Sequence, residues 1–199
     1  MQPLNMTQNI WLLRHGNRHD FVHPEWFKSA PKRYDPPLSE DGMIQVQSLA
    51  NKWQNADIKH IFASPFLRTI QTAHPIADKL HLKIKLEAGL GEWHNPDWMT
   101  EAPEIHSREE LEKKYPLIDW GYASQIVPQY PENESALHTR LAHLALFLTQ
   151  RYETNLLLVA HSHTVAGIAN ALLPTPQKFT IPVGSYLHLQ QQERRWALV

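Results

Sequence analysis

Residues 9–16 read Asn-Ile-Trp-Leu-Leu-Arg-His-Gly, and residues 155–163 read Asn-Leu-Leu-Leu-Val-Ala-His-Ser-His. Each stretch begins with an apolar run of the length of a buried strand, and each run leads to a histidine. Strands that are apolar on both faces are typical of parallel sheets covered by helices on each side. These two stretches therefore predict an α/β fold.

Strand-like runs and helical stripes alternate through the rest of the chain. Further strands are predicted at residues 58–63 and 82–86, and as a closing pair at 181–190 and 194–199. Apolar stripes at helical spacing predict one helix capped by Ser39 and one that begins near Pro65, with a short helical piece near 107–115. Two more helices are predicted by the stripes that start at Leu137 and Val165, the first ending near Tyr152 and the second before Pro174. This alternation predicts a three-layer α/β/α sandwich with a mostly parallel central sheet.

Two segments lack this regular pattern. Residues 17–37 are polar, aromatic and rich in proline, which predicts a long loop. Residues 93–132 carry three Trp, three Tyr and five Pro, which predicts a loop-rich, lid-like insertion. Since 199 residues suit one domain, we expect a single domain over 1–199.

Composition excludes several classes of protein. Without cysteine there is no disulfide framework, cysteine-based zinc site or thiol nucleophile. The 19 Lys and Arg balance 20 Asp and Glu, so no positive field points to nucleic acid. No apolar run approaches the roughly 18 residues of a membrane span, and residues 10–13 are too short for a signal-peptide core. We expect a cytoplasmic protein that binds neither nucleic acid nor membranes.

Chemically active side chains follow four of the predicted strands. They are Arg14, His15, Asn17 and Arg18, then Ser64 and Arg68, then Glu92, and last His161, Ser162 and His163. Ligands of α/β sheets bind at the carboxyl ends of the strands, so we expect these side chains to share one edge. So many cationic groups would repel one another without an anion, and arginine suits a tetrahedral phosphate. The sequence therefore predicts a phosphate site.

Such a site can support covalent chemistry as well as binding. A neutral histidine ring is a nucleophile toward phosphorus near pH 7, and neighbouring arginines disfavour its charged form. A carboxylic acid such as Glu92 can protonate a leaving alcohol. Its rival is Glu87, which we expect to be a surface residue at a strand end.

The ordered motifs resemble the histidine phosphatase superfamily, in its phosphoglycerate-mutase-like branch. The resemblance is carried by Arg14-His15-Gly16, by Ser64-Pro65-Phe66-Leu67-Arg68-Thr69-Ile70-Gln71-Thr72-Ala73 and by Leu158-Val159-Ala160-His161. It extends from about residue 9 to residue 190. The chain is most similar to the suppressors of T-cell-receptor signalling and the ecdysteroid-phosphate phosphatases, because Arg18 follows the first motif and Glu92 lies in Gly-Leu-Gly-Glu-Trp.

This resemblance implies a metal-independent phosphomonoester hydrolase without a cofactor. His15 would attack phosphorus and become phosphohistidine, and Glu92 would serve as general acid and then as base. The phosphoryl oxygens would be bound by Arg14, Arg18, Arg68 and His161, with Asn17 and Ser162 as further candidates. The ligand would be a small-molecule phosphomonoester or inorganic phosphate, with the 93–132 insertion over the active site.

Three alternatives stand beside this interpretation. The same groups could pass the phosphoryl group to a second hydroxyl, as a mutase does, or could bind a phospho-ligand without turnover. A metal-dependent hydrolase would use either His15, His19 and His23 or the pair His161 and His163.

Aromatic side chains of the insertion, such as Trp98 and Trp120, could line the mouth of the site.

Overall fold

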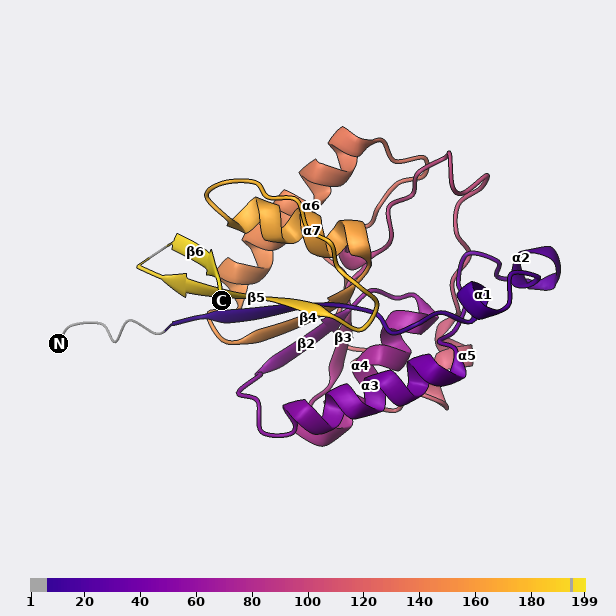
Figure 1. The fold of residues 1–199 in the computed structure, drawn as a ribbon, viewed down its shortest axis with the longest axis horizontal. Coiled ribbons are helices and arrows are strands. Elements are labelled where there is room, and N and C mark those ends of the chain that lie inside the picture. Colours follow the sequence, from indigo (N-terminus) through magenta and orange to yellow (C-terminus); the bar gives the residue numbers. More distant parts are fainter. Residues whose placement is uncertain (1–6, 194) are drawn as a thin grey trace.

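A computed structural model describes residues 7–193 and 195–199, which contain one six-stranded sheet (Figure 1). The strands are β1 (Asn9–Arg14), β2 (His60–Ala63), β3 (Ile84–Leu86), β4 (Leu156–Ala160), β5 (Tyr186–Gln192) and β6 (Arg195–Leu198). Their order is β3-β2-β4-β1-β5-β6. The first four of these are mutually parallel, and β5 and β6 form an antiparallel pair at one edge. The sheet is therefore mixed and mostly parallel, as the sequence predicts.

Helices cover both faces of the sheet. On one face lie α3 (Glu40–Trp53) and α4 (Leu67–Leu80), and on the other lie α6 (Glu134–Arg151) and α7 (Ser162–Leu172) (Figure 1). Strand β4 is buried throughout and alternates between the two apolar cores. Leu156, Leu158 and Ala160 join the α6–α7 core, whereas Leu157 and Val159 join the α3–α4 core. The predicted three-layer sandwich is confirmed.

The starts of α3 and α5 follow capping residues of the sequence, and the start of α4 does not. Ser39 accepts the amide of Gly42 and begins α3 as predicted, and Ser107 with Glu110 forms a capping box on α5 (Arg108–Glu112). Helix α4 begins at Leu67 rather than at Pro65. Its first amide donates to the carboxylate of Asp35, at 2.7 Å, from a loop remote in sequence.

Two other boundaries differ from the prediction. The segment 17–37 is not loop throughout, because it contains the short helices α1 (His19–Val22) and α2 (Trp26–Ser29). Strand β5 begins five residues later than expected, since Gly184 adopts a left-handed turn at φ 71° and donates to the carbonyl of His15. The predicted last strand starts at Arg194, which lies outside the described residues.

The segments 17–37 and 93–132 contact each other at the carboxyl end of the parallel strands, on the right in Figure 1. Their contacts include ion pairs of Lys32 and Arg33 with acidic side chains of the insertion, and a hydrogen bond between Tyr34 and Thr100. The short 3-10 helix η1 (Ala88–Leu90) leads from β3 into this region. Among the described helices, none is long and apolar enough to cross a membrane.

Candidate active site

The strand order brings the two histidines that follow β1 and β4 together. The amide of His15 donates to the carbonyl of Ala160, at 3.1 Å. The rings of His15 and His161 meet edge to face, with centroids 5.4 Å apart, and both residues are buried. Ser64 follows β2 and is also buried, and its amide donates a hydrogen bond to the carbonyl of Val159. The sheet therefore gathers three strand ends at one point, as the sequence predicts.

Within the described residues, one of the two ring nitrogens of His15 has no hydrogen-bond partner. Its Nδ1 lies 2.8 Å from the carbonyl oxygen of Gly16, and because a carbonyl only accepts, Nδ1 carries the proton. Burial, reinforced by the charges of Arg68, Arg18 and Arg14, holds the pKa of His15 well below its usual value. The ring is therefore neutral near pH 7, and Nε2 has an available lone pair.

Gly16 allows this turn to fit between α3 and α4. A Cβ at this position would lie 2.8 Å from Cγ1 of Val46 and 3.2 Å from the carbonyl of Gly42. Its amide donates to Oγ1 of Thr72 on α4, at 3.1 Å. A larger residue would displace the backbone that orients His15.

His161 is neutral as well, with the opposite tautomer. Arg68 Nη2 donates to its Nδ1 over 3.2 Å, so its Nε2 carries the proton and donates to Oγ of Ser64 at 2.8 Å. Burial, followed by the charge of Arg68, lowers the pKa of His161 well below its ordinary value.

Arg68 is the most deeply buried arginine of the site, with 1% of its side chain exposed. It donates to the carbonyl of Tyr34 and lies 3.7 Å from the carboxylate of Asp35. Its guanidinium stacks on Phe66, 4.6 Å from the ring centroid. Burial lowers the pKa of Arg68 to about 10, so the side chain stays charged near neutral pH.

Two further arginines complete the basic cage. Arg14 donates to the carbonyl of Ile181, at 2.7 Å. Arg18 makes a bidentate pair with the buried Asp20, and its charge lowers the pKa of both His15 and Arg68. Within the described chain, the buried Nε atoms of Arg14 and Arg68 have no hydrogen-bond partner. Buried unpaired donors in a cationic cage suit an anionic ligand.

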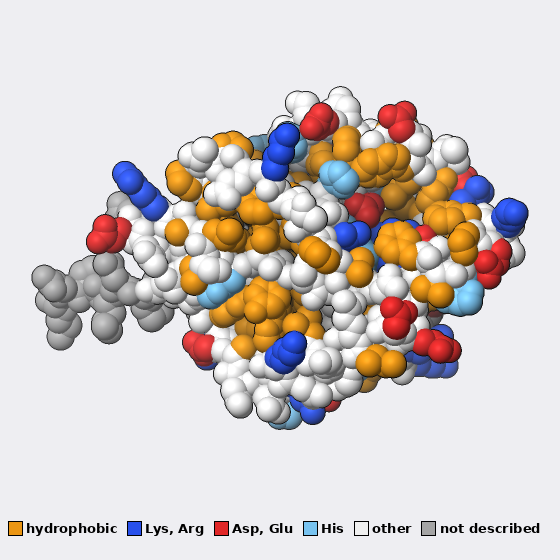
Figure 2. Space-filling model, in the orientation of Figure 1, with side chains coloured by type: hydrophobic (Ala, Val, Ile, Leu, Met, Phe, Trp, Pro, Cys, Tyr) orange, Lys and Arg blue, Asp and Glu red, His pale blue; other side chains and the backbone are white. Residues whose placement is uncertain are grey.

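Glu92 lies at the edge of this cage. Its Oε2 is 3.4 Å from Nδ1 of His161 and 3.6 Å from Nη2 of Arg68, and 14% of its side chain is exposed. Its Oε1 accepts the amide of Trp93. The carboxyl group therefore adjoins both the cage and solvent. Figure 2 shows a recess right of centre in which basic, acidic and histidine surfaces gather between hydrophobic side chains.

The expectation that Glu87 is a surface residue is wrong. Its side chain is fully buried, and its carboxylate accepts hydrogen bonds from η1 and from the insertion. The donors are Oη of Tyr122 at 2.6 Å and the amides of Gly89, Gln125 and Ile126. Glu87 thus anchors the insertion, and the alternation of its strand gave no sign of this.

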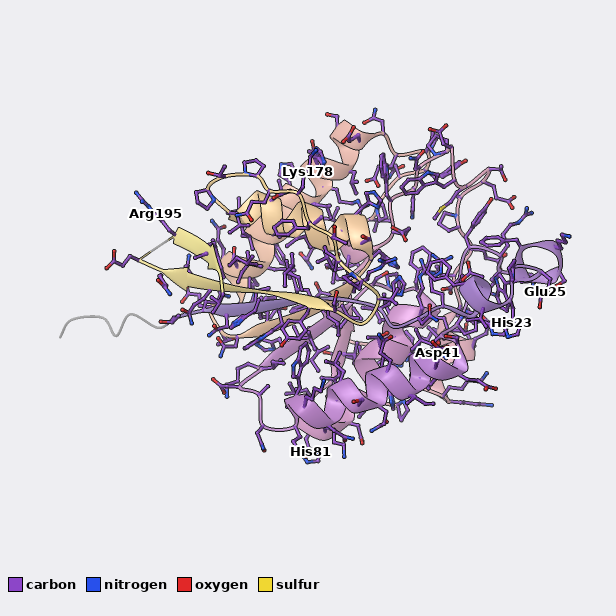
Figure 3. The ribbon with its side chains drawn as sticks, in the orientation of Figure 1. His23, Glu25, Asp41, His81, Lys178 and Arg195 are labelled. Carbon is purple, nitrogen blue, oxygen red and sulfur yellow. The ribbon has the colours of Figure 1, made fainter. Side chains whose placement is uncertain are left out.

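Two predicted phosphate contacts lack a supporting contact. The amide group of Asn17 donates to Asp41 on α3 and accepts the backbone amide of Arg18, so both of its polar ends are engaged away from the imidazole pair. Asp41 lies at the start of α3 in Figure 3. Ser162 opens α7 directly after His161, but no hydrogen bond of its hydroxyl occurs within the described residues. Both roles stay predictions.

The other histidines and tryptophans that the sequence singles out lie in three separate places. His19 and His23 stack on each other at α1, where Figure 3 labels His23 beside Glu25. His163 packs against Trp98, which in turn contacts Trp93 beside Glu92. Trp120 packs instead in a small core with Ile70, away from this group. In residues 7–193 and 195–199, no cluster of three or more His, Cys, Asp or Glu side chains could hold a metal ion.

Sequence reasoning missed three buried charged residues around the site. Asp35 connects the start of α4 to His106 of the insertion, at 2.9 Å, and lies within a segment that carries no pattern. Arg140 and Glu132 form a buried ion pair behind η1. A signal for Arg140 does exist, because it interrupts the apolar stripe of Leu137, Leu141 and Leu144 on its helix.

Comparison with known proteins places the chain in a family. Residues 10–199 match the family model of the histidine phosphatase superfamily, branch 1. A transcription factor tau 55 kDa subunit of Saccharomyces cerevisiae is 30% identical over 84% of this chain and 41% of its own length. An ecdysteroid-phosphate phosphatase of Drosophila melanogaster is 26% identical over 97% of this chain and 32% of its own.

The chain thus spans about a third to two fifths of these curated relatives. A solved ecdysone phosphate phosphatase from Bombyx mori, in complex with tungstate, superimposes with a TM-score of 0.79 at 22% identity. It covers 96% of this chain and 92% of that one. These findings confirm the resemblance that the motifs carry: the chain belongs to branch 1 of the histidine phosphatase superfamily.

Proposed function

We propose that this chain hydrolyses phosphomonoesters without a metal ion, through a phosphohistidine on His15. The observation that carries the proposal is the state of that ring. His15 is buried and neutral, its Nδ1 is occupied by Gly16, and its Nε2 is free within a cage of guanidinium groups. A neutral nucleophile beside fixed positive charge suits attack on an anionic phosphorus centre.

In the first step, Nε2 of His15 attacks phosphorus as the bond between phosphorus and the ester oxygen breaks. Glu92 donates its proton to that oxygen, so the alcohol leaves neutral. The three arginines compensate the charge on the phosphoryl oxygens. Both ring nitrogens of His161 have protein partners, Arg68 at Nδ1 and Ser64 at Nε2, so a contact of His161 with the phosphoryl group stays a prediction. The products of this step are the alcohol, a Glu92 carboxylate and phosphohistidine.

In the second step, water attacks phosphorus on the side from which the alcohol left. The carboxylate of Glu92 takes a proton from this water, and the bond between phosphorus and Nε2 breaks. Inorganic phosphate, protonated Glu92 and neutral His15 result, which restores the starting state. The partial exposure of the Glu92 side chain, 14%, supports this role, because it leaves the carboxyl group open to water from outside the cage.

The donor set supports independence from metal ions. Arg14, Arg18 and Arg68 supply the positive charge that magnesium supplies in other phosphoryl-transfer enzymes. Each of the three is fixed by protein partners before substrate binds, through Ile181, Asp20 and Tyr34 respectively.

A mutase is the second candidate, because a probable phosphoglycerate mutase of Yersinia pestis is 28% identical over 84% of this chain. A mutase would pass the phosphoryl group from His15 to another hydroxyl of the substrate instead of to water. The partial exposure of Glu92, whose side chain is 14% accessible to solvent, favours hydrolysis over this transfer.

The proposal is tested by hydrolysis of p-nitrophenyl phosphate in the presence of EDTA. We expect turnover by the wild-type chain and loss of turnover in His15→Ala. In Glu92→Ala we expect a roughly 100-fold or larger fall in kcat, because Glu92 is also the base that activates water in the second step. His143→Ala, which changes an exposed histidine on α6, serves as the matched control and should behave as wild type. Turnover that EDTA abolishes, or that survives in His15→Ala, would refute the proposal.

A further inference from the structure

Arg140 contacts both a buried carboxylate and the backbone that carries Glu92. Arg140 lies on the buried face of α6, with 4% of its side chain exposed, and Glu132 beside it is 3% exposed. Its Nε and Nη2 each donate to the Glu132 carboxylate over 2.7 Å. Buried ion pairs add little net stability, so the pair with Glu132 alone does not explain a buried arginine at this position.

The remaining donors of Arg140 all reach one short stretch of backbone. Nη1 donates to the carbonyls of Gly89, at 2.7 Å, and Gly91, at 3.2 Å, and Nη2 reaches that of Glu92 at 3.4 Å. An arginine has five N–H donors, and here two contact a carboxylate and three contact backbone carbonyls of the segment 89–92. Lysine, with three donors from a single nitrogen, lacks this geometry.

The segment 89–92 is fixed from its other sides as well. Oγ1 of Thr164, on α7, donates to the carbonyl of Gly91 at 2.9 Å. The chain of Glu132 runs alongside, where its carbonyl accepts the indole N–H of Trp93 and its amide donates to the carbonyl of His94. Arg140 and Thr164 therefore approach the same carbonyl from two helices.

By contrast, the carboxyl group of Glu92 has few contacts of its own. Within the described residues, its one hydrogen-bond donor at short range is the amide of the next residue, Trp93. The approaches of His161 and Arg68 are longer, at 3.4 and 3.6 Å. The position of the carboxyl group is therefore set by the backbone beneath it.

We infer that Arg140 is a positioning residue for proton transfer by Glu92, acting through the backbone of residues 89–92. The inference rests on the proposed function, because it requires Glu92 to be the acid. A shift of the acid by about 1 Å can cost roughly 100-fold in rate, although the groups that bind phosphate stay in place.

Leaving-group dependence separates this role from a merely structural one. Phenol has a pKa of about 10, like the tyrosine side chain, and needs a proton to leave, whereas p-nitrophenol is more acidic and needs it less. Displacement of the acid should therefore lower kcat/KM for phenyl phosphate much more than kcat/KM for p-nitrophenyl phosphate. General loss of structure would lower both equally.

The experiment compares Arg140→Lys with Arg151→Lys, the same change at an exposed position of the same helix, and with Glu92→Gln. For Arg140→Lys we expect roughly a 10- to 100-fold loss on phenyl phosphate and a much smaller one on p-nitrophenyl phosphate. Inhibition by inorganic phosphate should stay as in wild type, because the arginine cage is unchanged. Arg151→Lys should match wild type in all three measurements.

The outcomes separate the two claims. If Glu92→Gln shows the selective loss and folded Arg140→Lys does not, the positioning role of Arg140 is refuted and the proposed function stands. If Glu92→Gln shows no selective loss, the proposed acid itself is wrong, and the inference falls with it.

Circular dichroism and urea unfolding check that the variants are folded. Should Arg140→Lys not fold, Thr164→Val carries the test, since it removes one donor to the carbonyl of Gly91 and preserves side-chain volume. A smaller selective loss on phenyl phosphate is then expected. If kcat/KM changes by the same factor on both substrates, relative to wild type, the inference is overturned.

Discussion

The Ser64 hydroxyl sets the position of the proton on the buried imidazole of His161. Its Oγ accepts from Nε2 of His161, whose other nitrogen accepts from Arg68. Ser64→Ala leaves a buried N–H unpaired, so we expect the free energy of unfolding to fall by about 1–3 kcal/mol and kcat/KM to fall roughly tenfold.

Urea unfolding and steady-state kinetics measure both effects. Ser185→Ala is the control, because that hydroxyl donates to the carbonyl of Pro182 in an exposed turn. Wild-type values of both quantities in Ser64→Ala would contradict the tautomer assigned to His161.

At the scale of elements, the insertion depends on the buried carboxylate of Glu87. Oη of Tyr122 donates to it at 2.6 Å. Burial raises the pKa of Tyr122 above its usual value, and the hydrogen bond to Glu87 raises it further. Tyr122→Phe removes one hydrogen bond to a charged group, so the free energy of unfolding should fall by about 1.5–3 kcal/mol.

Activity should change little in this variant, because Glu87 keeps the amides of Gly89 and Gln125 as donors and Glu92 stays in place. Urea unfolding and hydrolysis of p-nitrophenyl phosphate provide the two measurements. Unchanged stability would show that the Tyr122 hydroxyl does not fasten the insertion.

Elements with a strong local pattern were predictable, and those fixed by distant contacts were not. The apolar run before His15 and the Ser39 cap gave β1 and the start of α3 almost to the residue. The start of α4 depends on Asp35, and the start of β5 depends on a turn that packs against His15. Periodicity reports none of these distant partners.

The same distinction holds for the site. His15, Arg68 and His161 follow predictable strands, so the rule of strand ends brought them together. The burial of Glu87 was not predictable, because it results from tertiary packing around the insertion. Arg140 was missed although it interrupts the apolar stripe of its helix. The polar ends of Asn17 are engaged by Asp41 and Arg18, which spacing along the chain does not reveal.

For the whole molecule, the buried neutral histidines predict a stability that depends on pH. The pKa values of His15 and His161 are lowered on folding, so below about pH 6.5 the unfolded chain binds more protons than the folded chain. Their contribution is fully present above that pH and is lost as pH falls toward the folded-state pKa values. Two such residues predict a decrease of roughly 2 kcal/mol in the free energy of unfolding between pH 6.5 and 5.5.

Urea unfolding at a series of pH values measures this dependence. His15→Asn removes one member of this buried pair, so its slope against pH should be shallower than that of the wild type. A wild-type stability that is constant or that rises on acidification would contradict the neutral state of the imidazole pair.

The central claim is a covalent bond between phosphorus and His15, and trapping tests it most directly. The wild-type chain is denatured in alkali during turnover of a phosphomonoester, digested, and its peptides are mapped by mass spectrometry. We predict one phosphoryl group on His15 that survives alkali, is lost in acid and is absent from His15→Asn. A phosphoryl group on another residue, or turnover by His15→Asn at the wild-type rate, would contradict the proposed mechanism.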